Sequence, residues 1–308
     1  MSLELRVEDY DKLCASFQCE RPNPLIAVHT IESDLWQRLR LTAAIYMSKC
    51  LPGDEVILDE KELLDAYVTH EKTLKNMTPN GMIVPKRHTV LEYNALVRAF
   101  ADLVDSLGFQ HMIQSWHVPM NLRIKYGEVN EANLERRHPT EHVHSDSWAG
   151  ESTESVTTHL CIFGDTARNH LVFYAAPPDF EEEWLGPRHS YADGFKVAEK
   201  YAKIDFVPER GQLILADFAS LHASNRLPGA GPRVSIDTTF HLKRAWAEGD
   251  QEVIHPSRIA ERAAHEVLKG IGESHLFMFP DGVDDHVDAN SGLGFKHATN
   301  LVVVDLLK

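Results

Sequence analysis

Between His111 and about His241 the sequence consists of short segments rich in β-branched and aromatic residues, separated by glycine, proline and asparagine. Such segments are typical of β-strands, and no helix-length pattern lies between most of them. Parallel strands need long, usually helical crossovers, whereas antiparallel strands do not. The sequence therefore predicts an antiparallel sandwich or barrel. The clearest strands are predicted at residues 120–126, 156–163, 170–176, 211–218 and 233–240.

Helical periodicity flanks this β region on both sides. Apolar residues at helical spacing predict helices over residues 33–49, 61–74 and 90–107, and Gly108 follows the third helix as a C-cap. An amphipathic pattern over residues 256–270 predicts a further helix. We therefore expect a mainly β fold with flanking helices.

The same patterns predict how the chain is organised. We expect an N-terminal helical cap over residues 1–110, a catalytic core over 111–245 and a C-terminal helical tail over 246–308, in one compact unit. An insertion rich in acidic and aromatic residues, 179–201, interrupts the strands. Because it has no evident role in the core, we expect this insertion, the N-terminal helices or both to cover a substrate.

The charge of the chain restricts its partners. The formal net charge of −15 repels phosphates, which argues against binding of nucleic acid or anionic membrane surfaces. The N-terminus lacks the pattern of a signal peptide, and no stretch approaches 18 consecutive apolar residues. The four cysteines are scattered, which favours free thiols in a reducing cytoplasm. We expect a cytoplasmic monomer or homodimer.

The triplet His144-Ser145-Asp146 is a candidate for metal binding. Alternate residues of a strand point to the same face, so that His144 and Asp146 can both face a barrel interior. An imidazole and a carboxylate placed in this way supply two adjacent ligands, and a distant histidine completes a two-histidine, one-carboxylate triad. H-x-D triplets also arise by chance in a chain with 18 histidines, and His286-Val287-Asp288 is a second one.

The residues that follow distinguish the two triplets. After the first, an apolar strand leads to His222, and Arg233 follows eleven residues later with Ser235 two positions beyond it. A guanidinium and a hydroxyl on one strand face suit the distal carboxylate of a short dicarboxylic acid. No arginine follows the second triplet, which therefore cannot build this arrangement.

These residues resemble the double-stranded β-helix superfamily of Fe(II)/2-oxoglutarate-dependent dioxygenases, over roughly residues 121–240. The resemblance implies a jelly-roll, cupin-like core with iron(II) held by His144, Asp146 and His222. It also implies that Arg233 and Ser235 bind 2-oxoglutarate, which reacts with O2 and is converted to succinate and CO2. The oxidant formed at the iron then takes hydrogen from an unactivated C–H bond of a small molecule, possible outcomes being hydroxylation, desaturation, ring closure or epimerisation.

Two stretches, THLCIFGDTARNHLVFY and LILADFASLHASN, loosely resemble the phytanoyl-CoA-hydroxylase-like branch of this superfamily. The usual proline-glycine-serine-histidine turn of that branch is replaced here by residues 175–178, Ala-Ala-Pro-Pro. The presence of Asp146 disfavours halogenation, because halogenases of the superfamily lack this carboxylate. Thr239 stands where nucleic-acid demethylases have a second arginine. The sequence thus favours small-molecule oxidation, with hydroxylation as the default outcome.

Further residues near these motifs are candidates for ligand contacts. Arg123 and Tyr126 lie on a predicted strand, and Thr158 precedes another. Asp237 shares the face of Arg233, so that we expect it to pair with this arginine or to bind a polar substrate. Each has a purely structural alternative, such as a salt bridge between strands. Trp148 follows the triplet closely and is a candidate for the substrate pocket or for core packing. His142 is expected to act behind the metal ligands or to be exposed.

Two alternative functions remain open at the level of the sequence. A cupin-type metal oxygenase would need no 2-oxoglutarate, and the pair Arg233 and Ser235 argues against it. A non-catalytic β-sandwich binding module would carry its histidines on a polar face, without a metal. Turnover that depends on 2-oxoglutarate distinguishes the first alternative, and iron(II) binding distinguishes the second.

Overall fold

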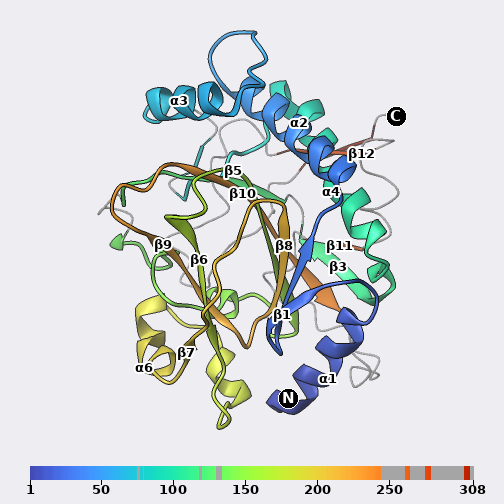
Figure 1. The fold of residues 1–308 in the computed structure, drawn as a ribbon, viewed down its shortest axis with the longest axis vertical. Helices are drawn as coiled ribbons and strands as arrows, with labels where there is room; N and C mark the ends of the chain where they lie inside the picture. The colour runs from blue at the N-terminus through green and yellow to red at the C-terminus, as the bar shows by residue number, and fades with distance from the viewer. Residues whose placement is uncertain are drawn as a thin grey trace.

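The computed structural model describes residues 1–74, 77–78, 80–117, 120–129 and 134–243, together with strand residues 261–263, 275–278 and 302–305. The described α-helices are α1 (Leu3–Cys14), α2 (Ser33–Cys50), α3 (Glu60–His70), α4 (Val90–Ser106) and α6 (Phe195–Ala198). The described 3₁₀ helices are η1 (Arg87–Thr89), η2 (Gln110–Met112), η3 (Asp146–Ala149), η4 (Glu182–Leu185) and η5 (Tyr191–Gly194). In Figure 1, α2, α3 and α4 gather on one side of the strands, and α1 lies at the opposite end.

The strands form one large and one small antiparallel sheet. The large sheet has the order β1 (Glu20–Asn23), β2 (Ile26–Thr30), β8 (Gln212–Asp217), β5 (Ser155–Gly164), β10 (Arg233–Leu242), β3 (Ile113–His117) and β11 (Glu261–Ala263). Strand β4 (Asn121–Lys125) pairs with β10 beside β3. The small sheet has the order β7 (Ala202–Lys203), β6 (Asn169–Ala175) and β9 (Leu221–Arg226). A separate pair consists of β12 (His275–Met278) and β13 (Val302–Asp305).

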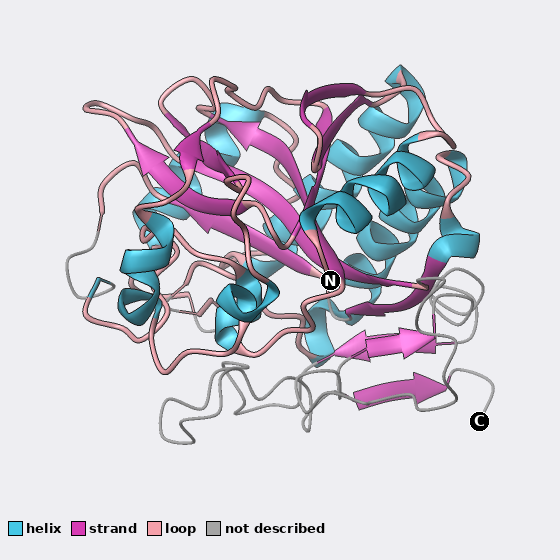
Figure 2. Ribbon diagram, turned by 90° about the horizontal axis from the view of Figure 1, so that it is seen from below, coloured by secondary structure: helices cyan, strands magenta, loops and turns pink. Residues whose placement is uncertain are grey.

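The two sheets face each other across a pocket. Side chains from β4, β5, β8 and β10 of the large sheet line this pocket together with side chains from β6 and β9 of the small sheet. Figure 2 shows helices flanking these strands. Two facing antiparallel sheets with flanking helices confirm the predicted mainly β, jelly-roll core.

Alternation along the strands separates the hydrophobic core from the pocket. On β10, Val234 and Ile236 are fully buried in the main hydrophobic cluster, which also contains residues of the helices. The intervening residues Arg233, Ser235 and Asp237 line the pocket instead. Because successive side chains of a strand point to opposite faces, the apolar face packs against the helices and the polar face lines the pocket. This confirms that Arg233 and Ser235 share a strand face.

Most predicted elements agree with the structure. The three predicted helices correspond to α2, α3 and α4, and all five predicted strands are present as β4, β5, β6, β8 and β10. Gly108 has a φ of 76°, a left-handed conformation that favours glycine just after a helix. None of the helices that the structure describes is long and apolar enough to cross a membrane.

Two expectations for the ends of the chain need correction. The first third is not purely helical, because β1 and β2 lie within it and β2 extends the large sheet beside β8. Within the helix predicted over 256–270, residues 261–263 form β11, which pairs with β3. Pairing with a distant strand prevails over local helical periodicity at these residues. The other residues of that predicted helix lie outside the described part of the chain.

Candidate metal and anion site

A mutual backbone contact brings His144 and His222 together. Each residue donates its backbone N–H to the backbone carbonyl of the other, at 2.9 Å in both directions. This isolated bridge joins the segment before η3 to β9 in the small sheet. Asp146 is the first residue of η3 rather than part of a strand, which corrects the expectation that the triplet is extended. The bridge, and not strand alternation, therefore places the triplet beside His222.

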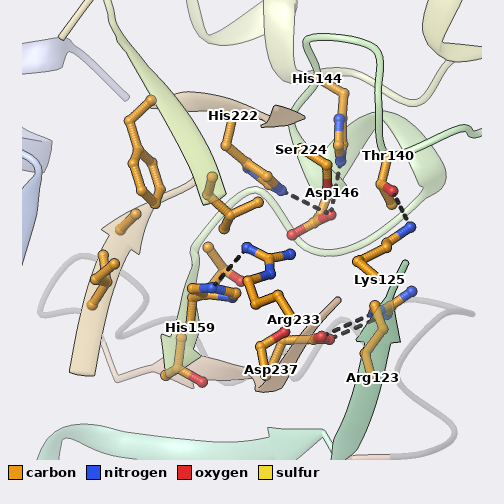
Figure 3. Close-up of a pocket in the computed structure, with 17 residues that line it drawn as sticks. Arg123, Lys125, Thr140, His144, Asp146, His159, His222, Ser224, Arg233 and Asp237 are labelled. Atoms are coloured by element: carbon orange, nitrogen blue, oxygen red, sulfur yellow. Dashed lines mark hydrogen bonds and ion pairs between the residues drawn. The ribbon is translucent and has the colours of Figure 1, made fainter. Parts of the chain in front are cut away.

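The three side chains converge on one point of the pocket, as Figure 3 shows. The distance from Asp146 Oδ1 is 3.6 Å to His144 Nε2 and 3.9 Å to His222 Nε2. One ligand atom from each residue lies within 4.8 Å of the others. Two imidazole nitrogens and one carboxylate oxygen are a donor set that suits iron(II) and leaves coordination positions open. The fold thus brings His144, Asp146 and His222 together, as the sequence predicts.

Hydrogen bonding and burial favour the protonation states that a metal requires. His144 Nδ1 lies 2.6 Å from the carbonyl oxygen of His142, which can only accept, so that Nδ1 carries the proton and Nε2 has a free lone pair. Burial, followed by the nearby His144, lowers the pKa of His222 to about 4. Burial alone would raise the pKa of Asp146, but His222, His144 and Arg123 outweigh it and lower this pKa to about 2. At neutral pH His222 is therefore a neutral imidazole and Asp146 is a carboxylate.

The insertion over residues 179–201 supports His144 directly. Tyr191 of η5 stacks on the His144 ring, with centroids 4.0 Å apart and an angle of 19° between the planes. Tyr191 is 1% exposed and packs in a cluster with Trp148 and Trp184. This segment therefore packs behind His144, a contact that the sequence did not predict. Its role as a substrate lid stays a prediction.

A buried arginine lies in the same pocket. Arg233 is 2% exposed, and among the described residues its Nε has no hydrogen-bond partner. Its NH1 lies 3.5 Å from His159 Nε2, and burial together with Arg233 keeps the pKa of His159 well below its usual value. His159 is therefore neutral and can accept this hydrogen bond. The Ser235 hydroxyl, 1% exposed, also has no partner.

These groups are suited to binding an anion. A buried guanidinium is costly unless a negative charge compensates it, and no carboxylate forms an ion pair with Arg233 within the described residues. Unsatisfied buried donors in a native fold usually indicate a ligand or solvent. Arg233 and Ser235 are thus placed as the sequence predicts for a carboxylate site.

Asp237 has a different partner from the one expected. Its carboxylate accepts from Arg123 Nε at 3.0 Å and from Asn121 Nδ2 at 2.6 Å, across the β4–β10 pair. The predicted pairing of Asp237 with Arg233 is therefore wrong. Arg123 and Asp237 both line the pocket but neutralise each other. Their contact with a co-substrate or substrate stays a prediction.

The fold gives Trp148 and Tyr126 packing roles and leaves Thr158 in the pocket. Trp148 is fully buried, its Nε1 donates to the Trp184 carbonyl, and it does not line the pocket. Tyr126 donates its hydroxyl to the Tyr67 carbonyl at 3.2 Å and packs against the main core. Their predicted substrate contacts are corrected to core packing. Thr158 lines the pocket, but its hydroxyl donates to the Thr238 carbonyl at 3.0 Å, and its co-substrate contact stays a prediction.

The sequence analysis missed the pocket residues Lys125 and His159, and it also missed Tyr191, which stacks on His144. Lys125 lies two positions after Arg123 on β4, and His159 lies two after Thr157 on β5, so that strand alternation alone was a usable signal. No sequence pattern connects Tyr191 to His144. The second triplet, His286 to Asp288, lies outside the described residues.

Comparison with known proteins gives only distant similarities. No family model matches the sequence, and no curated protein matches it significantly. The epimerase SnoN from nogalamycin biosynthesis, a non-haem, alpha-ketoglutarate-dependent protein, is 12% identical, with 76% of this chain and 82% of that chain covered and a TM-score of 0.40. EctD from S. alaskensis, solved with 2-oxoglutarate and 5-hydroxyectoine, is 14% identical, with 75% of each chain covered and a TM-score of 0.40.

AviO1 from Streptomyces viridochromogenes Tue57 is 12% identical, with 77% of this chain and 96% of that chain covered and a TM-score of 0.41. At these identities and TM-scores the similarities do not assign a function. The function of the chain must follow from its own site residues.

Proposed function

We propose that the protein is a non-haem iron(II) oxygenase that uses 2-oxoglutarate and O2 to oxidise a small molecule, with hydroxylation of an unactivated C–H bond as the expected reaction. The observation that carries this proposal is the combination of two features in one pocket. One is a cluster of two histidines and an aspartate, and the other is a buried arginine with an unpaired Nε beside an unpaired serine hydroxyl. A protein that only binds a metal would not need the buried arginine and the serine hydroxyl.

The residues fit the proposed cofactor. Nε2 of His144, Nε2 of His222 and Oδ1 of Asp146 would hold iron(II), which with 2-oxoglutarate supplies the activation of O2 and the conversion of the co-substrate to succinate and CO2. Arg233 and Ser235 would bind the distal carboxylate through charge-assisted hydrogen bonds. His159 would hold the guanidinium in place through its neutral Nε2.

The buried pocket also explains how water is kept from the reacting groups. Leu171, Phe173, Ile214 and Ala216 line it from β6 and β8, opposite the charged side chains. Apolar walls lower the local dielectric and strengthen each charge-assisted contact. The protein's own part in the reaction is therefore to hold the ligands, orient the dicarboxylate and exclude water.

Anaerobic titration of the iron(II) protein with 2-oxoglutarate tests the proposal. Chelation of iron by the keto acid should produce a weak visible charge-transfer band at saturating 2-oxoglutarate. A binding module would show no band, and a cupin-type oxygenase would bind iron without a response to 2-oxoglutarate. Absence of the band in the wild-type protein at millimolar 2-oxoglutarate would refute the proposal.

A screen in air then addresses the substrate. Candidate small molecules are added to the iron protein with 2-oxoglutarate, and succinate release is measured. A true substrate should increase succinate release above the basal rate and yield a product one oxygen atom heavier if the reaction is hydroxylation. A product two hydrogen atoms lighter would indicate desaturation or ring closure instead.

A further inference from the structure

A second buried cation lies beside Arg233. Lys125 is 6% exposed and lines the same pocket. In the antiparallel pairing of β4 with β10, Lys125 lies directly opposite Arg233. Directly opposite residues project from the same face of a sheet, with their Cβ atoms about 5 Å apart. Figure 3 shows the Lys125 and His159 side chains on opposite sides of Arg233.

The acidic groups around Lys125 do not balance the positive charge. Its Nζ donates to Thr140 Oγ1 at 2.7 Å and lies 3.6 Å from Glu141 Oε1. That same oxygen accepts a shorter hydrogen bond, 3.0 Å, from Arg226 NH1. One carboxylate is thus shared between Lys125 and Arg226, while Arg233 has none. Among the described residues Glu141 is thus the one carboxylate in ion-pair contact with these three cations.

The excess positive charge affects the ammonium group itself. Burial is the main cause that lowers the pKa of Lys125 to about 7, and Glu141 opposes this effect. Arg123, Arg226 and Arg233 lower the pKa further. Among the described residues these four groups act most strongly on Lys125, from β4, β9, β10 and the segment before η3, and Asp146 and Asp237 line the same pocket. An anion bound between Lys125 and Arg233 would reverse this balance and favour the ammonium form.

We propose that Lys125 is a second cation of the co-substrate site, which shares the distal carboxylate of 2-oxoglutarate with Arg233 and takes up a proton from solvent when the dicarboxylate binds. This inference rests on the proposed function and assigns it a further residue. Arg233 supplies a planar fork that fixes the orientation of the carboxylate, and Lys125 supplies a point charge whose strength depends on pH. Co-substrate affinity is therefore coupled to the proton concentration.

The coupling has a defined sign. Well below pH 7 Lys125 already carries its proton, and binding needs no uptake. Above pH 7 the empty site loses the proton while the complex retains it, so that each bound 2-oxoglutarate takes up as much as one proton. The dissociation constant should then rise with pH, by a factor that approaches about tenfold per pH unit. Both carboxyl groups of free 2-oxoglutarate are ionised in this range, so the proton does not go to the ligand.

Isothermal titration calorimetry of the anaerobic iron(II) protein with 2-oxoglutarate tests this proposal. Titrations at pH 6.5, 7.5 and 8.5, in buffers of different ionisation enthalpy, give the number of protons taken up. Wild type should take up about a quarter of a proton at pH 6.5 and nearly one proton at pH 8.5. With 2-oxobutyrate, which has the keto acid but no distal carboxylate, uptake should be absent.

Two substitutions separate charge from structure. K125M removes the charge, and we expect a dissociation constant at pH 6.5 about tenfold higher, with no proton uptake and no further rise with pH. K125R keeps a permanent cation, and we expect affinity close to wild type with no uptake. The control K61M removes a lysine that is 84% exposed, and it should behave as wild type. If K125M fails to fold, wild type and K125R still decide the question.

The results also distinguish this inference from the proposed function. Equal uptake in wild type and K125R, or wild-type binding without any uptake at pH 8.5, would overturn the role of Lys125. The proposed function would stand in that case, provided that 2-oxoglutarate still binds and that binding requires Arg233. Failure of wild-type protein to bind 2-oxoglutarate at any pH would instead overturn the function itself.

Discussion

The metal end and the anion end of the pocket are assembled in different ways. At the anion end, Arg233, Ser235 and Lys125 project from β10 and β4, and the register of this strand pair places them side by side. At the metal end, His144 and Asp146 come from a segment outside the strands, and a single backbone bridge joins that segment to His222. The anion end is thus part of the large sheet, whereas the metal end joins the small sheet through a backbone bridge outside the named strands.

The contacts that support the two ends of the pocket also differ. Val234 and Ile236, between the pocket residues of β10, are fully buried against the helical layer, so that the anion end rests on the main hydrophobic core. His144 rests instead on Tyr191 and on the His142 carbonyl. Substitutions at the two ends should therefore separate iron binding from 2-oxoglutarate binding. The following four predictions use this separation.

The largest effect is expected for Asp146→Ala at the metal end. Loss of the only carboxylate in the His144, Asp146 and His222 cluster leaves two histidine ligands. Iron(II) affinity should therefore fall by more than about 100-fold, which is more than the usual loss when a residue behind a metal ligand is replaced. Succinate formation should disappear. The matched control is Asp288→Ala in the second triplet, which should be nearly silent. Wild-type iron affinity and turnover in Asp146→Ala would exclude the assigned triad.

At the anion end, Arg233→Ala should raise the apparent 2-oxoglutarate constant by about 30-fold or more, with almost unchanged iron affinity. Removing one partner of a buried charge pair typically costs about 2–5 kcal/mol, and about 1.4 kcal/mol corresponds to a factor of ten. Arg233→Lys should restore only part of the affinity, because an ammonium cannot form the two-pronged contact. Both constants are measured by titration of the visible band. A fall in iron affinity of the same size would contradict the separation of the two ends.

A smaller effect is expected when the support behind His144 is removed. Tyr191→Ala should lower iron(II) affinity by about tenfold, the lower end of the range for outer contacts of metal ligands, because His144 loses the ring that stacks on it. Tyr191→Phe retains the stacked ring and should bind iron almost as wild type does. Iron titration of folded protein, checked by circular dichroism, measures both variants. Equal losses in both would assign the effect to the hydroxyl and not to stacking.

The smallest effect is expected for Ser235→Ala. An ordinary hydrogen bond contributes about 1 kcal/mol, which corresponds to a rise of about fivefold in the 2-oxoglutarate constant. Iron affinity should not change, because Ser235 lies on the pocket face of β10 and does not belong to the cluster of His144, Asp146 and His222. The same band titration is sensitive enough to resolve this factor. A constant equal to that of wild type would leave Arg233 without the predicted hydroxyl partner.

The sequence by itself determined five strands of the core and the residues His144, Asp146, His222, Arg233 and Ser235 of the site. Alternation of apolar and polar residues on β10 specifies which face packs and which is free, so that Arg233 and Ser235 were predictable together. Likewise, helical spacing was sufficient for α2 and α4, which bury one apolar stripe each. These are local properties, set by periods of two and 3.6 residues.

Tertiary structure decided which residues meet. The pairing of β4 with β10 places Lys125 opposite Arg233 and Arg123 beside Asp237, and the register of two strands far apart in the chain cannot be obtained from either strand alone. The same holds for the bridge between His144 and His222. For this reason the sequence identified the metal ligands without their true backbone setting.

Burial was also decided by the fold rather than by residue type. Trp148 follows the metal triplet closely, yet a tryptophan gains most from packing, and its ring lies in the core with Trp184 and Tyr191. Residues 261–263 have a helical pattern, yet pairing with β3 provides backbone hydrogen-bond partners that make them a strand. Nearness in sequence and local periodicity are short-range signals, whereas packing and strand pairing depend on residues that only the folded chain brings together.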